Sequence, residues 1–239
     1  MIQKDEEIAR LGLKDLKIIQ KKSGFRFGTD AVLLARFAAP KRKDRVVDLC
    51  SGTGIVPILL SGLYEPKEII AVEILPQMAE MATRSMEMNA LENVSVVCRD
   101  LKGCYKELGE SFDAVTCNPP YMKVSEGILN QTDEKSIARH EIHCNLEDCI
   151  KEAARLLKFG GRLSMIHRAD RLADMLVLMR QYRLEPKRMQ CVHPSKDLPP
   201  NLVLVEADKG RSSGLKFESP IYLYDEQGNM RALLKEATV

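Results

Sequence analysis

From residue 45 onward, short apolar runs typical of strands alternate with longer amphipathic runs typical of helices. Strand-like runs are expected at 45–49, 68–73, 94–98, 112–117, 162–167, 187–192 and 202–207. Helix-like runs are expected at 55–63, 76–90, 101–108, 145–158 and from 172 onward. This alternation predicts an α/β fold in which a mostly parallel sheet carries helices on both of its faces.

The first forty residues do not follow this alternation of strands and helices. Residues 1–40 are expected to form an N-terminal extension packed on the core. Its expected parts are a short hairpin that pairs Lys17–Gln20 with Phe25–Phe27, and a helix over Asp30–Phe37. Residues 41–239 would form the main domain, and the two parts together would make one structural domain.

A second departure is the long polar connection over residues 119–144. Loops of this length inside a compact domain are usually functional or disordered. After it, Asn145 is a good N-cap for a helix that would run to Lys158, and Gly160 and Gly161 would stop that helix. Ligands of open α/β sheets bind beyond the carboxyl ends of the strands, so this connection is expected to lie beside the ligand.

The composition indicates a soluble globular protein, with 45% hydrophobic residues, 29% charged residues and a net charge of +2. The sequence shows neither an apolar run of membrane-spanning length nor a secretion signal, which predicts a cytoplasmic protein without a membrane partner. The seven cysteines show no paired spacing and are expected to be reduced. The cluster of His140, His143, Cys144 and Cys149 lacks a CxxC pair, so no metal is expected.

The sharpest local pattern is a strand, a glycine-rich turn and a helix start, which read Val-Val-Asp-Leu-Cys-Ser-Gly-Thr-Gly-Ile over 46–55. Gly52 and Gly54 allow the backbone to approach a ligand closely. A dinucleotide fingerprint would need glycine where Pro57 stands, and a phosphate-binding loop would need a lysine at the helix start, which is missing. The turn therefore favours a ligand with an amino-acid end and no phosphate.

Acidic residues stand at the ends of three successive strands. Asp48 can accept hydrogen bonds from a cationic amino group, Glu73 from two ribose hydroxyls, and Asp100 from an adenine amino group. Together they match the parts of S-adenosylmethionine, which predicts this cofactor and S-adenosylhomocysteine as its product. The alternative is a tight strand-to-helix turn that binds no ligand.

The fourth strand runs into Asn118-Pro119-Pro120-Tyr121. An exocyclic amino group is a poor nucleophile because its lone pair is delocalised into the ring. The Asn118 side-chain oxygen and the Pro119 carbonyl can accept hydrogen bonds from its two N–H groups. The prolines hold that carbonyl still, and Tyr121 can stack on a planar base. These residues alone allow an adenine, a cytosine or a glutamine amide as the acceptor, and the alternative is a rigid turn.

The two motifs together resemble the class I N6-adenine and glutamine-amide methyltransferases. The chain looks closest to the bacterial enzymes that methylate N6 of the adenine beside the anticodon of a valine tRNA. Further segments similar to that family lie at 25–35, 72–79, 138–141, 157–163, 184–188, 192–194 and 204–210, and the similarity spans roughly residues 14–225.

This resemblance implies a Rossmann-like, class I fold with a seven-stranded, mostly parallel sheet, and a tRNA substrate. It implies that the base is held by Asn118, Pro119, Pro120 and Tyr121. It also implies a set of cofactor-binding residues: Asp48, Gly52, Thr53, Gly54, Glu73, Ile74, Asp100, Leu101 and Asn118, with Thr29 and Asp30 near the methionine end. Two departures are Cys50, where many members have glycine, and Thr29, where many have another small residue.

Other acceptors stay open. Protein glutamine-amide N5-methyltransferases share the four-residue motif, but they usually carry a separate helical N-terminal domain, and only about forty residues precede the first core strand here. N6-methylation of rRNA is a further alternative, as is methylation of DNA, for which the chain shows no separate target-recognition domain. A catalytically silent RNA-binding module would not need the intact Asn118 and the three acids. No obligate protein partner is evident.

Overall fold

The computed structural model describes residues 2–23, 28–120 and 145–230. Its main sheet has the strand order β10-β8-β9-β7-β6-β3-β4-β5, with β11 also paired to β8. The strands are β3 (Arg45–Leu49), β4 (Glu68–Glu73), β5 (Val94–Cys98), β6 (Phe112–Cys117), β7 (Leu157–Arg168), β8 (Leu184–His193), β9 (Leu202–Lys209), β10 (Lys216–Phe217) and β11 (Ile221–Tyr222). Seven long strands form the sheet as predicted, and the two-residue strands β10 and β11 extend it beyond β8.

One strand of the main sheet, β9, runs opposite to its neighbours among the described residues. β5, β4, β3, β6 and β7 run parallel to one another, whereas β9 is antiparallel to both β7 and β8. β4 and β6 flank β3. After β3 the chain therefore forms the neighbour on one side, β4, and only later the neighbour on the other side, β6. That crossover opens a crevice beyond the carboxyl ends of β3, β4 and β6, where ligands of open α/β sheets bind.

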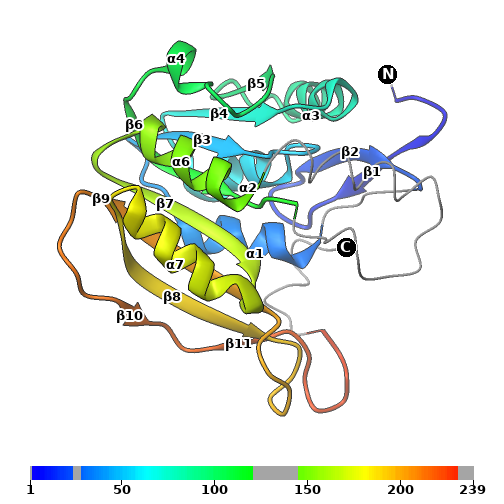
Figure 1. The fold of residues 1–239 in the computed structure, drawn as a ribbon. Helices are drawn as coiled ribbons and strands as arrows, with labels where there is room; N and C mark the ends of the chain where they lie inside the picture. The colour runs from blue at the N-terminus through cyan, green and yellow to red at the C-terminus, as the bar shows by residue number, and fades with distance from the viewer. Residues whose placement is uncertain (1, 24–27, 121–144, 231–239) are drawn as a thin grey trace.

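Helices cover both faces of the sheet (Figure 1). α1 (Thr29–Ala38), α2 (Ile55–Tyr64) and α3 (Pro76–Met88) pack on one face, in one hydrophobic core. α4 (Tyr105–Leu108), α6 (Leu146–Leu156) and α7 (Leu172–Gln181), the last preceded by a 3-10 turn at Ala169–Arg171, pack on the other. Across the described residues, no helix is long and apolar enough to cross a membrane.

The N-terminal extension contains a hairpin, and the strand predicted to pair with Lys17–Gln20 lies outside the described residues. β2 (Lys17–Lys21) pairs with β1 (Glu6–Arg10), which precedes it, while Phe25–Phe27 lie outside the described residues. A buried ion pair joins this hairpin to the core: the Glu6 carboxylate accepts two hydrogen bonds from Arg84 of α3 at 2.8 and 2.9 Å. The Arg84 guanidinium lowers the pKa of Glu6 to about 2, so the hairpin is fastened to α3 by a charged pair.

The end of α6 also differs from the prediction. The helix stops at Leu156, and β7 starts at once with Leu157, so Gly160 and Gly161 lie inside the strand. The pairing of β6 with β7 shifts register between Phe112 and Ala114. A Cβ on Gly161 would lie 2.9 Å from the Phe112 carbonyl oxygen, so glycine is needed where the two backbones approach closely.

Candidate functional site

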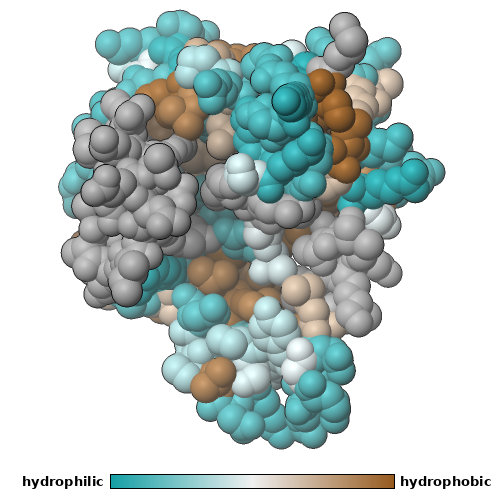
Figure 2. All heavy atoms as spheres, turned by 90° about the vertical axis from the view of Figure 1, so that its right-hand side faces the viewer, coloured by the Kyte–Doolittle hydropathy of each residue, from teal (hydrophilic) through white to brown (hydrophobic). Residues whose placement is uncertain are grey.

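The residues predicted to bind a ligand gather at the carboxyl-terminal edge of the parallel strands. β3, β4, β5 and β6 all end there, and the N-terminus of α1 points to the same edge, at the right of Figure 1. Figure 2 looks onto this edge and shows a hollow in which hydrophobic and hydrophilic surface lie next to each other. The topology therefore brings residues together that are far apart in the sequence.

The glycine turn between β3 and α2 has a backbone that reverses sharply. Cys50, Gly52 and Gly54 have φ angles of 59°, 57° and 84°, all in the left-handed region that favours glycine. Ser51 N–H donates to the Val72 carbonyl at 3.1 Å, which anchors the turn on β4. The turn lies between the carboxyl end of β3 and the start of α2, and its two glycines allow a ligand to approach the backbone closely.

Gly54 is also required by packing. A Cβ at this position would lie 2.5 Å from Met86 Cε and 3.1 Å from Ala82 Cβ on α3. We expect Gly54→Ala to lower the free energy of unfolding by about 2–4 kcal/mol, because backbone strain and overpacking add. Gly103→Ala is the matched control, since Gly103 has a φ of 83° and no atom within 4 Å of such a Cβ.

Urea unfolding of both variants measures the difference. Gly103→Ala should lose only about 1 kcal/mol, the cost of the left-handed conformation. Equal losses in the two variants would show that the contact with α3 adds nothing.

Asp48 is buried in the middle of the site, with 1% of its surface exposed. Its Oδ1 accepts a hydrogen bond from Thr116 Oγ1 at 2.6 Å, and its Oδ2 accepts one from Ser51 Oγ at 2.7 Å. Burial raises the pKa of Asp48 to about 7, against the lowering effect of these two hydrogen bonds, and the nearby Glu73 charge adds to the rise. A cationic group placed beside Asp48 would favour its ionised form.

Glu73 closes β4 and holds the glycine turn. Its Oε2 accepts from Gly52 N–H at 2.7 Å, and its Oε1 accepts from Leu75 N–H at 2.9 Å. The side chain is 5% exposed. Each carboxylate oxygen has a second lone pair, so Glu73 keeps acceptor capacity for a ligand while it braces the loop.

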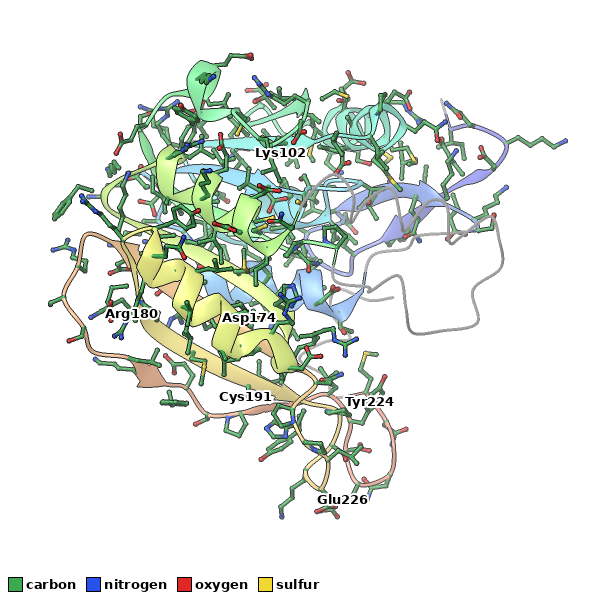
Figure 3. The ribbon with its side chains drawn as sticks, viewed as in Figure 1. Lys102, Asp174, Arg180, Cys191, Tyr224 and Glu226 are labelled. Carbon is green, nitrogen blue, oxygen red and sulfur yellow. The ribbon has the colours of Figure 1, made fainter. Side chains whose placement is uncertain are left out.

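The third acid, Asp100, lies further out. Its Oδ1 accepts from Lys102 N–H at 2.9 Å, and the carboxylate also faces the Lys102 ammonium at 3.8 Å. Lys102 is labelled beyond the end of β5 in Figure 3. Leu101 and Thr53 are buried, and Ile74 is half-buried next to Glu73. Ile74 and Leu101 are thus apolar residues that directly follow the second and third acids.

Asn118 follows the last residue of β6 and meets a residue 88 positions away. Its Nδ2 donates to Asp30 Oδ2 at 3.0 Å, and Asp30 Oδ1 accepts from Ala31 N–H at 2.9 Å in the first turn of α1. Asn118 Oδ1 is buried and has no hydrogen-bond partner among the described residues. The amide is thus held through its nitrogen, and its oxygen is left as an acceptor for a ligand.

The remaining predicted residues have mixed outcomes. Pro119 is buried and Pro120 half-buried directly after Asn118, while Tyr121 lies outside the described residues. Thr29 is the first residue of α1, beside Asp30. Sequence reasoning missed Ser51 and Thr116, which hold the Asp48 carboxylate. Neither residue stands in a pattern that marks this role, and Thr116 looks like an ordinary strand residue.

Comparisons with known proteins agree on one class of protein, the methyltransferases. The family model described as methyltransferase small domain matches residues 22–182. A tRNA1(Val) (adenine(37)-N6)-methyltransferase of Porphyromonas gingivalis is 30% identical over 202 residues, which cover 81% of this chain and 78% of the relative. A protein of the same name from Parabacteroides distasonis is 24% identical over 220 residues, or 90% of this chain and 92% of the relative.

Solved structures support the same fold. A predicted O-methyltransferase from Agrobacterium tumefaciens superposes with a TM-score of 0.69 at 27% identity, covering 87% of this chain and 94% of the other. TYW2 of M. jannaschii in complex with AdoMet superposes with a TM-score of 0.60 at 16% identity, covering 87% of each chain. The second likeness shows the fold alone.

Proposed function

The chain belongs to the methyltransferase small domain family, and we propose that it methylates N6 of adenine 37 in a valine tRNA. It is an S-adenosylmethionine-dependent methyltransferase with a class I fold. The choice of nucleotide is supported by the name of its relatives, which cover most of the chain in both directions.

The residues at the strand ends suit the parts of the cofactor. Asp48 would accept from the amino group of the methionine end, and the glycine turn with Thr53 leaves room for that end. Glu73 would accept from the ribose hydroxyls, with Ile74 next to the sugar. Asp100 and Leu101 would border the adenine. The bound cofactor supplies an electrophilic methyl group on a sulfonium, and the protein residues orient the acceptor toward it.

Asn118 Oδ1 is the observation that carries this proposal. A buried amide oxygen without a partner costs free energy in the folded protein, on the order of 1–3 kcal/mol, unless a ligand supplies a donor. The exocyclic amino group of adenine has two N–H bonds, one for Asn118 Oδ1 and one for the Pro119 carbonyl. Both acceptors draw the nitrogen lone pair out of the ring, and the extra proton leaves to solvent after the methyl group has arrived.

Asp30 has a positioning role in this scheme. It accepts from Asn118 Nδ2 at 3.0 Å and so fixes which end of the amide is left to accept from a ligand. Thr29 and Asp30 lie at the N-terminus of α1, next to the methionine end of the cofactor in our proposal. A base in an anticodon loop is only partly stacked, so turning it into such a pocket costs little.

The test uses labelled S-adenosylmethionine and an unmodified transcript of the valine tRNA that carries adenine 37. We expect the purified protein to label this transcript, and digestion followed by mass spectrometry to give N6-methyladenosine. The matched control is the same transcript with guanine at position 37, which should stay unlabelled.

Two outcomes would contradict the proposal. Equal labelling of the guanine-37 transcript would place the methyl group elsewhere in the RNA. Labelling found only in a separate pool of rRNA, DNA or protein would show that tRNA is not the methyl acceptor. Labelling of the protein pool would point to a glutamine amide.

A further inference from the structure

Three cysteine thiols meet on the face of the sheet opposite to Asp48. Cys50 follows β3, Cys117 ends β6, and Cys149 lies in the opening turn of α6. Their sulfur atoms all lie within 4.8 Å of one another. Cys117 and Cys149 have no exposed surface, and Cys50 is half-buried. The fold thus gathers thiols that no spacing in the sequence connects.

We propose that Cys50, Cys117 and Cys149 form a site for a soft, thiophilic metal ion such as Zn²⁺. The inference stands apart from the methyl-transfer proposal, because it concerns a cluster whose sulfur atoms that scheme does not use. It also differs from the expectation that the sequence contains no metal site, which considered only His140, His143, Cys144 and Cys149.

The geometry requires little movement. Zinc binds thiolate sulfur at about 2.3 Å, so two sulfurs on one tetrahedral ion are about 3.8 Å apart. A contraction of roughly 1 Å at most brings the three sulfurs from their present separations to that distance. A disulfide would use only two of them, and it needs the sulfurs at about 2.05 Å. Three mutually close sulfurs therefore suit a metal better than a disulfide.

The ligand set selects the ion. The cluster consists of sulfur alone, so it suits Zn²⁺, Cd²⁺ or Cu⁺ rather than Mg²⁺ or Ca²⁺, which prefer oxygen. On binding, each thiol loses its proton to solvent and its sulfur becomes a thiolate ligand, so three thiolates and one divalent ion carry a net charge of −1. Cys149 lies at the positive end of α6, which favours that charge.

Occupancy would tie together the elements that carry the candidate active site. Cys50 immediately precedes Ser51, which donates to Asp48, and Cys117 immediately precedes Asn118. A metal would link the glycine turn and the end of β6 to the start of α6. We therefore expect binding to raise the thermal stability of the protein, since a ligand that binds only the folded state stabilises it.

The experiment titrates the reduced, metal-free protein with Cd²⁺ and follows the ultraviolet charge-transfer absorption of cadmium thiolates. We expect one Cd²⁺ per chain, displacement by Zn²⁺, and a rise in the unfolding midpoint. Cys50→Gly should weaken Cd²⁺ binding by at least about 100-fold. We expect the Cys50→Gly variant to fold, because Cys50 has a φ of 59° that glycine adopts without strain.

The matched control is Cys191→Ala. Cys191, labelled in Figure 3, is also a half-buried thiol, but it lies on β8, which β9 and β7 separate from β6 and β3. This variant should bind Cd²⁺ like the wild type, and Cys149→Ala should bind it as poorly as Cys50→Gly. Undiminished binding by a folded Cys50→Gly protein, or an equal loss in Cys191→Ala, would overturn the proposal.

Discussion

Asn118→Ala should slow methyl transfer by about 100- to 1,000-fold without unfolding the protein. Removing one preorganised polar group from the reacting atoms typically lowers kcat by about 100- to 1,000-fold. We expect a loss of this size in single-turnover transfer to the unmodified tRNA transcript. Cofactor affinity, measured by calorimetry, should change by less than about threefold, because Asn118 acts on the acceptor nitrogen in our scheme.

The stability of this variant is part of the prediction. Asn118 gives one hydrogen bond to Asp30 and leaves Oδ1 without a partner among the described residues. The lost bond contributes about 1 kcal/mol, while removal of the orphaned oxygen relieves a similar cost. The unfolding midpoint should therefore stay close to that of the wild type.

Asn93→Ala is the matched control, with the opposite expected pattern. Asn93 accepts from Ser61 Oγ at 2.8 Å and donates to the Pro66 carbonyl at 2.9 Å, so its amide is satisfied at both ends. Its loss should destabilise the protein by about 1–2 kcal/mol and leave transfer per folded molecule unchanged. Normal transfer by Asn118→Ala would rule out the mechanism that we propose.

The contact between Asp30 and Asn118 explains what sequence reasoning can and cannot supply. Asn118 was found because it stands in a rare motif at the end of a strand. Asp30 was placed near the site by resemblance, but its partner was not foreseen, since 88 residues separate the two side chains. Contacts of this kind depend on how α1 lies across the edge of the sheet, and local patterns carry no information about that.

Strand prediction from the sequence likewise succeeded for some strands and failed for another. The boundaries of β3, β4, β5 and β6 matched the prediction, because each is a β-branched apolar run bounded by turn residues. β1 was missed, since Glu6–Arg10 carries charges that read as a solvated segment. Its Glu6 is buried only because Arg84 of α3 meets it, so the partner that makes the strand possible lies far along the chain.

The glycines after α6 were misread for a comparable reason. Two adjacent glycines normally end a helix, and the prediction applied that rule. The helix ends earlier, and Gly161 instead allows β7 to pass close to the Phe112 carbonyl of β6. The need for glycine at position 161 comes from an interstrand contact that appears only in the assembled sheet.

Glu73→Ala should have the second large effect, this time on the cofactor. Both carboxylate oxygens of Glu73 accept backbone N–H bonds, one from Gly52 in the glycine turn and one from Leu75. The substitution leaves two donors without their partner and frees the turn, and it removes the proposed ribose acceptor. We expect cofactor affinity to fall by at least about 100-fold, since each lost charged hydrogen bond contributes about 1.5–3 kcal/mol.

Glu73→Gln separates the two roles of this side chain. The amide keeps one oxygen to accept an N–H bond, but its NH₂ group faces the second backbone donor, so the loop is only partly restored. Affinity should lie between those of the wild type and Glu73→Ala. Removing the Glu73 charge also lowers the pKa of the neighbouring Asp48, because that charge contributes to its rise.

Glu68→Gln is the matched control at the opposite end of the same strand. Glu68 pairs with Arg45 at 2.6 Å on a partly exposed surface, where an ion pair contributes little. Its loss should change stability by less than about 1 kcal/mol and leave cofactor affinity unaltered. Calorimetric titration of the three variants with S-adenosylhomocysteine measures the affinities, and urea unfolding measures the stability of Glu68→Gln. Unchanged affinity in Glu73→Ala would remove Glu73 from the cofactor site and leave it a purely structural brace of the glycine turn.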